Sequence, residues 1–204
     1  MNSELRDTYD RIAEDWHTDH TSDDWWLDGT DAFIALLPPG GSVLDVGCGS
    51  GTKIGYLIRH GLHVTGIDFS QKQIDLAKKD YPAATLTCMT MEDIDQLSET
   101  FDGVFAQASL LHIPKKNIGE MMKKMTGRLK PQGALYIAVK ERREGEPEEE
   151  IRVEQDYGYP YERFFSYFTL PELASYMENQ GLTVVWQKRD LLKKTVWLQI
   201  IGKK

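Results

Sequence analysis

Three glycines between Val43 and Thr52 form the segment of the sequence with the clearest chemical meaning. The segment reads VLDVGCGSGT, so Gly47, Gly49 and Gly51 alternate with small residues directly after a short apolar run. Because glycine weakens strands and helices, such a cluster indicates unusual backbone angles or the close approach of a ligand. The exposed N–H groups of the loop, and of the helix expected after it, favour a carboxylate or a phosphate.

An acidic residue lies at the distance expected for a nucleoside-binding partner of this loop. Asp68 ends a second apolar segment and follows Gly47 by about 20 residues, a spacing that suits a carboxylate accepting hydrogen bonds from both ribose hydroxyls. The pair therefore indicates a cofactor that contains adenosine. A dinucleotide fold requires Gly-x-Gly-x-x-Gly, but here the third glycine comes one position early, at Gly51. No phosphate-binding loop ending in Gly-Lys-Ser/Thr is present.

Alternating apolar segments and amphipathic helices surround these residues and determine the expected fold. Periodicity predicts strands and helices, the strands at 42–46, 63–67, 84–88, 101–107, 134–139, 183–188 and 195–201, and the helices at 4–16, 52–60, 70–79, 117–129 and 170–180. Strands that alternate with helices form right-handed β-α-β units and a parallel sheet covered on both faces. The last two strands are too close in sequence for a parallel return. We therefore predict an α/β, Rossmann-like three-layer sandwich with a seven-stranded, mostly parallel sheet and one antiparallel strand near the C-terminus.

The ordered set of motifs resembles that of the class I S-adenosylmethionine-dependent methyltransferases that act on small molecules. After the glycine segment, four further segments are similar to family motifs: VTGIDFSQKQIDLAK, MTMEDI, FDGVFAQASLLHIP and GRLKPQGALYIA. The resemblance implies S-adenosylmethionine as methyl donor and S-adenosylhomocysteine as product. It also implies the cofactor-binding residues, namely Asp45, Gly47, Cys48, Gly49, Ser50, Gly51, Asp68, Phe69, Ser70, Thr90, Met91, Glu92, Gln107 and Ala108.

One position departs from the family pattern. Many relatives carry an aspartate where this chain has Thr90, and that carboxylate accepts a hydrogen bond from the adenine amino group. Here the hydroxyl of Thr90 or the neighbouring Glu92 must replace it. The backbone N–H of Met91 is still expected to pair with a ring nitrogen.

His112 is the candidate catalytic residue. It follows the fourth predicted strand in SLLHIP, near the position that the resemblance implies for the transferred methyl group. An unperturbed histidine titrates near neutral pH, as a general base requires, and a base is needed only when the nucleophile arrives protonated. The alternative is that His112 only orders its loop through hydrogen bonds.

The insertion at 141–169 is expected to lie over the substrate site, opposite an N-terminal helical cap at 1–37. Its first part, ERREGEPEEE, is rich in glutamate and is expected to be solvated and mobile. Its second part, YGYPYERFFSYF, is dense in aromatic residues, which indicates either a lid over an apolar, planar or cationic substrate or a satellite core or dimer contact. Arg163 is expected to meet a substrate carboxylate or a local glutamate. The residues expected to line the substrate are Tyr9, Trp16, Tyr157, Tyr161, Arg163 and Phe164.

Composition and charge exclude several other kinds of protein. The 204 residues fit a single methyltransferase domain covering 1–204, and the net charge of −8 opposes polyanion binding. AQAS replaces the Asn/Asp-Pro-Pro-Tyr/Phe motif that base-methylating enzymes carry, so nucleic acid is disfavoured as a substrate. The chain has no apolar run long enough for a membrane span, and two cysteines suggest a reduced cytoplasm. A monomer or homodimer without a metal site is expected.

Three functions are compatible with these residues. The first is transfer of a methyl group from S-adenosylmethionine to a small-molecule acceptor by in-line displacement. The second is a nicotinamide-dependent oxidoreductase that uses the same ribose-binding Asp68. The third is a noncatalytic protein that binds the cofactor or a partner.

Overall fold

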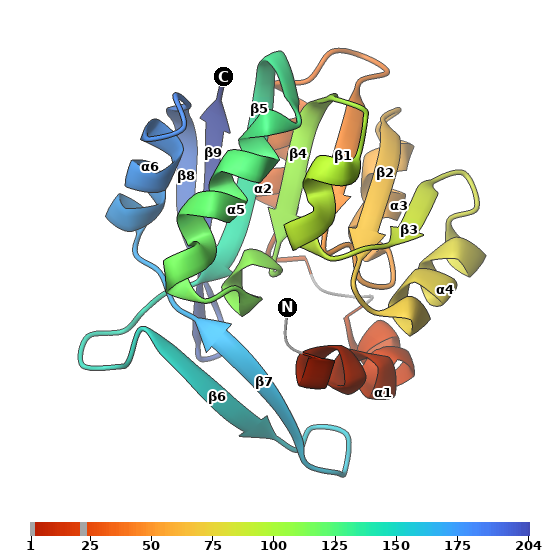
Figure 1. Ribbon diagram of the computed structural model, residues 1–204, viewed down its shortest axis with the longest axis vertical. Coiled ribbons are helices and arrows are strands. Elements are labelled where there is room, and N and C mark those ends of the chain that lie inside the picture. The colour runs from red at the N-terminus through yellow and green to blue at the C-terminus, as the bar shows by residue number, and fades with distance from the viewer. Residues whose placement is uncertain (1–2, 21–23) are drawn as a thin grey trace.

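A seven-stranded sheet forms the centre of the computed structural model, which describes residues 3–20 and 24–204 (Figure 1). The strands lie in the order β3-β2-β1-β4-β5-β9-β8. Within the described ranges, neighbouring strands of this sheet are parallel except at the two pairs that β9 makes, with β5 and β8. The predicted sheet with one antiparallel strand is therefore confirmed. The strand bounds are β1 Ser42–Val46, β2 His63–Asp68, β3 Thr85–Cys88, β4 Phe101–Gln107, β5 Leu129–Lys140, β8 Thr183–Leu192 and β9 Thr195–Lys203.

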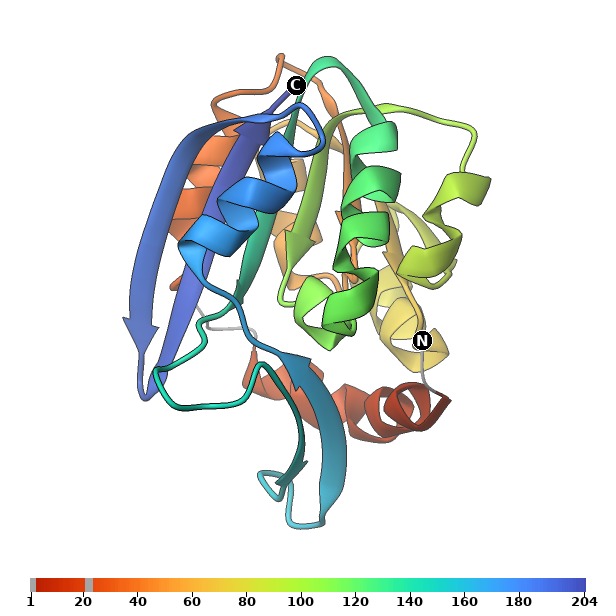
Figure 2. The ribbon, with the colours of Figure 1, turned by 60° about the vertical axis from the view of Figure 1, so that its left-hand side comes forward.

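Helices cover both faces of the sheet and bury one apolar core on each side (Figure 2). One face carries α2 Leu27–Ile34, α3 Thr52–Arg59 and α4 Gln71–Asp80, and the other carries η1 Met91–Gln96, α5 Lys115–Gly127 and α6 Leu170–Glu178. Apolar residues at helical spacing explain this packing, since α5 buries Ile118, Met122 and Met125. Ser70 is the N-cap of α4, because its hydroxyl accepts a hydrogen bond from the Gln73 N–H at 3.2 Å.

Two elements lie outside the sandwich, at the carboxyl ends of the parallel strands. They are α1 Ser3–Asp19 and the antiparallel hairpin of β6 Glu149–Glu154 and β7 Tyr161–Ser166, which Figure 1 shows below the sheet. No strand was predicted in the insertion. The pattern of β6 explains why: Ile151 and Val153 are 63% and 61% exposed, whereas the charged Glu154 turns inward to Arg163. In β6 the apolar side chains therefore face solvent and a charged one faces inward, the opposite of the usual pattern for a half-buried strand. A search for buried apolar positions does not find such a strand.

The helix α2 and the short helices η1 and η2 Leu110–His112 were not predicted either. The other differences from the predicted elements are at boundaries. β5 begins at Leu129, five residues before the predicted start at 134, and its pairing with β4 shifts register between Phe101 and Gly103. Gln132 has φ +65° in this irregular stretch, and its neighbours Pro131 and Gly133 are residues typical of turns, so the sequence does not indicate a strand there. In the part of the chain that the structure describes, no helix is both long and apolar enough to cross a membrane.

Candidate functional site

A cavity of about 530 Å³ lies at the carboxyl ends of the parallel strands, between the sheet and α1. It spans the point where the strand order reverses between β1 and β4, which is where open α/β sheets bind ligands. The predicted residues that line it come from six separate segments: Tyr9, Trp16, Asp45, Gly47, Cys48, Gly49, Ser50, Asp68, Phe69, Met91, Gln107, Ala108, His112, Tyr157 and Arg163.

The glycine loop shapes the floor of this cavity. Gly47 and Gly49 have φ values of +76° and +53°, which favour glycine. A side-chain carbon on Gly47 would lie 2.3 Å from Cβ of Ser109, whereas one on Gly49 would find nothing nearer than the amide oxygen of Gln73 at 3.9 Å. Gly47 therefore brings the loop close to the end of β4, and Gly49 leaves open space for a ligand.

Asp68 is hydrogen-bonded to two backbone N–H groups, one of them in the glycine loop. Its Oδ2 accepts from the N–H of Gly49 and its Oδ1 from that of Ser70, each at 2.9 Å. Burial raises the pKa of Asp68 to about 6, and the two hydrogen bonds oppose that rise. A carboxylate has about four lone-pair sites, so two remain for hydroxyl groups of a ligand.

Two further acceptor atoms point to a ligand that brings hydrogen-bond donors. Oδ2 of Asp45 and Oε1 of Gln107 are buried with no hydrogen-bond partner among the described residues, and both residues line the cavity. Burial raises the pKa of Asp45 to about 7, while the Lys53 ammonium opposes the shift. Such buried acceptors are costly unless paired, so they fit a ligand with amino and hydroxyl groups, as S-adenosylmethionine has.

Four residues predicted to bind the cofactor do not line the cavity and lie in the segments next to its lining: Gly51, Ser70, Thr90 and Glu92. The Ser70 hydroxyl donates to Asp10 at 2.5 Å, and that of Thr90 donates to Asp93 at 2.7 Å. A side-chain carbon on Gly51 would lie 2.7 Å from the Tyr81 ring, so this glycine serves helix packing. The fourth, Glu92, belongs to η1 and does not reach the cavity surface.

Two residues predicted to line the substrate, Tyr161 and Phe164, are absent from the cavity lining. Successive side chains of a strand point to opposite faces; Arg163 and Phe165 line the cavity, and Phe164 points away from it. The Tyr161 ring lies behind Tyr157, with centroids 5.6 Å apart, and its hydroxyl donates to Asp156 at 3.0 Å.

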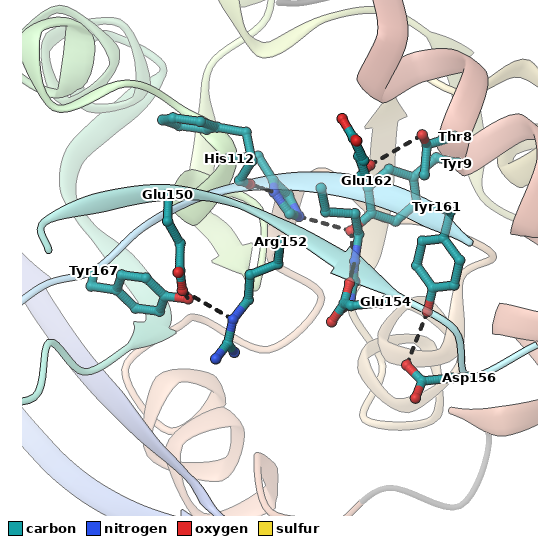
Figure 3. A network of polar contacts seen from close by, with 12 residues as sticks. Thr8, Tyr9, His112, Glu150, Arg152, Glu154, Asp156, Tyr161, Glu162 and Tyr167 are labelled. Carbon is teal, nitrogen blue, oxygen red and sulfur yellow. Dashed lines mark hydrogen bonds and ion pairs between the residues drawn. The ribbon is translucent and has the colours of Figure 1, made fainter. Parts of the chain in front are cut away.

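Tyr9 and His112 join α1 to the rest of the site (Figure 3). The Nδ1 atom of His112 lies 2.7 Å from the carbonyl oxygen of Phe164, and its Nε2 lies 2.7 Å from the Tyr9 hydroxyl. Since a carbonyl oxygen only accepts, Nδ1 carries the hydrogen and Nε2 accepts from Tyr9. Burial lowers the pKa of His112 to about 3, and the nearby Arg163 and Lys140 charges act in the same direction.

These contacts favour the ordering role of His112 over the general-base role. Both ring nitrogens have partners, and a pKa near 3 makes the imidazole a much weaker base than one tuned to neutral pH. Arg163 also has its partner within the chain. Its Nη2 lies 2.7 Å from Oε1 of Glu154, and its Nη1 donates to the Tyr9 hydroxyl at 3.3 Å. The expected salt bridge with a local glutamate is therefore present.

Several cavity residues were missed by sequence reasoning. Lys140 is the last residue of β5 and lines the cavity. Its position at the carboxyl end of a predicted parallel strand could have identified it from the sequence, because ligands of open α/β sheets bind at that edge. The position of Phe165 in the cavity lining could be predicted only with the pairing register of β6 and β7. Trp197 and Lys193 come from the β8–β9 pair, which folds back toward the cavity only in the tertiary structure.

A Gly47→Ala substitution is expected to lower the free energy of unfolding by about 2–5 kcal/mol. The left-handed backbone costs an L-residue about 1–2 kcal/mol, and the contact with Ser109 adds an overpacking cost of about 1–3 kcal/mol. Denaturant unfolding measures the change. Gly40→Ala is the matched control, because Gly40 has φ +71° and no heavy atom within 4 Å of the added carbon. Equal losses in the two variants would contradict the assigned contact with Ser109.

Comparison with known proteins agrees with this geometry. A family model described as a methyltransferase domain matches residues 43–133. The chain is 34% identical over 103 residues to the ubiquinone biosynthesis O-methyltransferase of Coxiella burnetii, a match that covers 48% of this chain and 43% of that relative. The chain thus spans less than half the length of this curated relative.

Two solved structures share the fold over nearly the whole chain. The 1,6-didemethyltoxoflavin-N1-methyltransferase of Burkholderia thailandensis, with 1,6-didemethyltoxoflavin and S-adenosylhomocysteine bound, has a TM-score of 0.77 at 22% identity and covers 99% of this chain and 88% of that one. The magnesium protoporphyrin IX methyltransferase of Synechocystis PCC 6803, with bound S-adenosylmethionine, has a TM-score of 0.72 at 16% identity and covers 100% of both chains.

Proposed function

We propose that this chain, which belongs to the class I S-adenosylmethionine-dependent methyltransferase family, transfers the methyl group of S-adenosylmethionine to a small-molecule acceptor. The observation that carries the proposal is the hydrogen bond between Asp68 and the N–H of Gly49, at the strand-order reversal. This contact supports the proposal because it holds the Asp68 carboxylate, the proposed acceptor for the ribose hydroxyls, beside the glycine loop. The bound cofactor supplies an activated methyl group on a sulfonium, and S-adenosylhomocysteine is the product.

The residues of the chain divide the work of holding this cofactor. We propose that Asp68 accepts from the ribose hydroxyls, that the glycine loop amides meet the carboxylate of the cofactor, and that Phe69 and Met91 cover the adenine. The unpartnered oxygens of Asp45 and Gln107 would accept from the amino group. Gly51, Ser70, Thr90 and Glu92 act indirectly, by holding the loops in place.

The elements outside the sandwich contribute the acceptor side of the cavity. We propose that, of the predicted cap at 1–37, α1 closes the site while α2 packs on the sheet, and that residues 141–169 act as an insertion within one domain. Of these, residues 1–2 and 21–23 lie outside the described part of the chain. The hydrogen bonds from Tyr9 to His112 and from Arg163 to Tyr9 tie α1 to the hairpin. The closed wall excludes water and orients the acceptor behind the methyl group. His112 is a positioning residue in this scheme.

Several finer features belong to the same proposal. The relatives named above act, by their names, in ubiquinone biosynthesis and on a toxoflavin precursor, which supports a small organic acceptor. The net charge of −8 argues against nucleic acid. Both cysteines are free thiols, which fits a reduced cytoplasm. A monomer or a homodimer is proposed.

Titration calorimetry with S-adenosylhomocysteine and, separately, with NAD tests the cofactor assignment. We expect saturable 1:1 binding of S-adenosylhomocysteine and no heat from NAD. The reverse result would favour the oxidoreductase. A screen of metabolite pools with methyl-labelled S-adenosylmethionine tests turnover, and label that never leaves the cofactor would favour a noncatalytic binding protein.

A further inference from the structure

Lys140 lies in the cavity without an anionic partner among the described residues. Lys140 ends β5 and lines the acceptor side, where its Nζ lies 3.9 Å from the ring centroid of Phe165 and 5.9 Å from that of Trp197. No hydrogen bond or ion pair reaches this ammonium from the residues that the structure describes. Buried charges are usually paired, so an unpaired ammonium facing a cavity needs an explanation.

The charged groups around Lys140 neutralise one another in pairs. Four charges act on it, those of Glu150, Arg152, Glu154 and Arg163, all on the hairpin. Arg163 is paired with Glu154, with 2.7 Å between Nη2 and Oε1. Arg152 is paired with Glu150, with 3.0 Å between Nε and Oε1. The hairpin therefore leaves the charge of Lys140 uncompensated, and burial lowers the pKa of Lys140 to about 8.

The rest of the acceptor side is lined by aromatic rings and by two carboxylates, Asp19 and Asp156, of which Asp156 accepts a hydrogen bond from the Tyr161 hydroxyl. Phe165, Trp197 and Tyr157 add apolar ring surface, although the Lys140 ammonium lies over Phe165, Trp25 stacks on Trp197, and Tyr161 stacks on Tyr157. The ring surface that remains suits a planar molecule. His112 has hydrogen-bond partners at both ring nitrogens. An acceptor that already carries an ionised oxygen needs no proton removed at that atom.

We propose that Lys140 binds an oxyanion of the methyl acceptor, a carboxylate or an ionised hydroxyl carried by an aromatic ring that packs against Phe165 and Trp197. The inference rests on the proposed function, because it names the substrate class of the same site. Lys140 supplies a charge-assisted hydrogen bond to that oxygen, in surroundings that keep the ammonium partly dehydrated.

Calorimetry on protein saturated with S-adenosylhomocysteine tests this at pH 7.5 with paired probes. The carboxylate arm compares benzoate, phenylacetate and 2-naphthoate with the three corresponding neutral amides. The hydroxyl arm compares 4-nitrophenolate with neutral 4-nitroanisole. In wild type we expect at least one anion to bind about 10-fold or more tightly than its neutral partner, as one charged hydrogen bond allows. The arm that shows the preference identifies the kind of oxyanion.

Variants assign the preference to the lysine. Lys140→Met and Lys140→Gln are expected to reduce it below twofold, and Lys140→Arg to keep most of it. Lys194→Met is the matched control, since it removes the same charge from an exposed site beside the β8–β9 turn. S-adenosylhomocysteine affinity is expected to stay within twofold in all four variants.

The possible results separate this inference from the proposed function. Failure of wild type to bind S-adenosylhomocysteine overturns both. Normal binding with no anion preferred over its neutral partner overturns the assignment of Lys140 alone. So does a preference that persists in both neutral variants, or a cofactor affinity that falls together with the preference.

Discussion

An Asp68→Ala protein is expected to bind S-adenosylhomocysteine at least about 100-fold more weakly than wild type. Hydrogen bonds to a charged acceptor contribute about 1.5–3 kcal/mol each, and two ribose hydroxyls would lose this acceptor. Each 1.4 kcal/mol is tenfold in Kd, so two bonds reach this factor. The substitution also removes the partner of the N–H groups of Gly49 and Ser70, which loosens the loop. Titration calorimetry measures the change.

Asp102→Ala provides the matched control for that loss. Asp102 is also a carboxylate that accepts a backbone N–H, that of Ser42 at 2.8 Å, but it lies at the amino end of β4, far from the cavity edge. Its removal is expected to leave the Kd unchanged. An Asp68→Ala protein with a Kd within twofold of wild type would refute the ribose assignment.

The same carboxylate predicts how cofactor binding depends on pH. Asp68 has a pKa of about 6 in the free protein, and the ionised form is the better acceptor for ribose hydroxyls. Affinity for S-adenosylhomocysteine is therefore expected to fall as the pH drops through 6. In Asp68→Asn, which cannot titrate there, the affinity is expected to be lower and this component of the pH dependence to be absent.

Replacing His112 by alanine is expected to lower turnover about 100-fold while S-adenosylhomocysteine affinity changes less than threefold. The substitution leaves the Tyr9 hydroxyl and the Phe164 carbonyl without their partner, so the wall that orients the acceptor shifts. A displacement of about 1 Å from the reactive geometry costs about 100-fold in rate. Turnover is measured with an acceptor found in the labelled-methyl screen.

The pH profile distinguishes this positioning role from base catalysis. The pKa of His112 is about 3, so the imidazole stays neutral across the working range. The kcat/KM profiles of wild type and His112→Ala are expected to have the same shape. Tyr9→Phe is expected to lower turnover less, since one of the two hydrogen bonds to the ring remains. His60→Ala is the control, because His60 is exposed and bonds only locally to the Tyr56 carbonyl. A limb near pH 6.5 that disappears in His112→Ala would show base catalysis instead.

Local sequence patterns were sufficient for the cofactor half of the site. The glycine positions indicate unusual backbone angles at single residues. The alternation of strands and helices follows from the short-range periodicity of apolar residues. β1 and β4 were predicted at their observed bounds. Because parallel strands bring their carboxyl ends to one edge, the positions of Gly49 and Asp68 followed once the strands were known.

The acceptor half depends on contacts between distant segments, which periodicity does not encode. The Tyr9–His112 hydrogen bond joins residues 103 positions apart. Phe165, rather than Phe164, faces the cavity because β7 pairs with β6 in one particular register. Lys140 lies near two rings only because the hairpin brings Phe165 to the end of β5 and the pairing with β9 puts Trp197 opposite Lys140. Glycines and strand periods thus specified the part of the cavity that we propose for the nucleoside, whereas long-range pairing alone determined which side chains line the part that we propose for the acceptor.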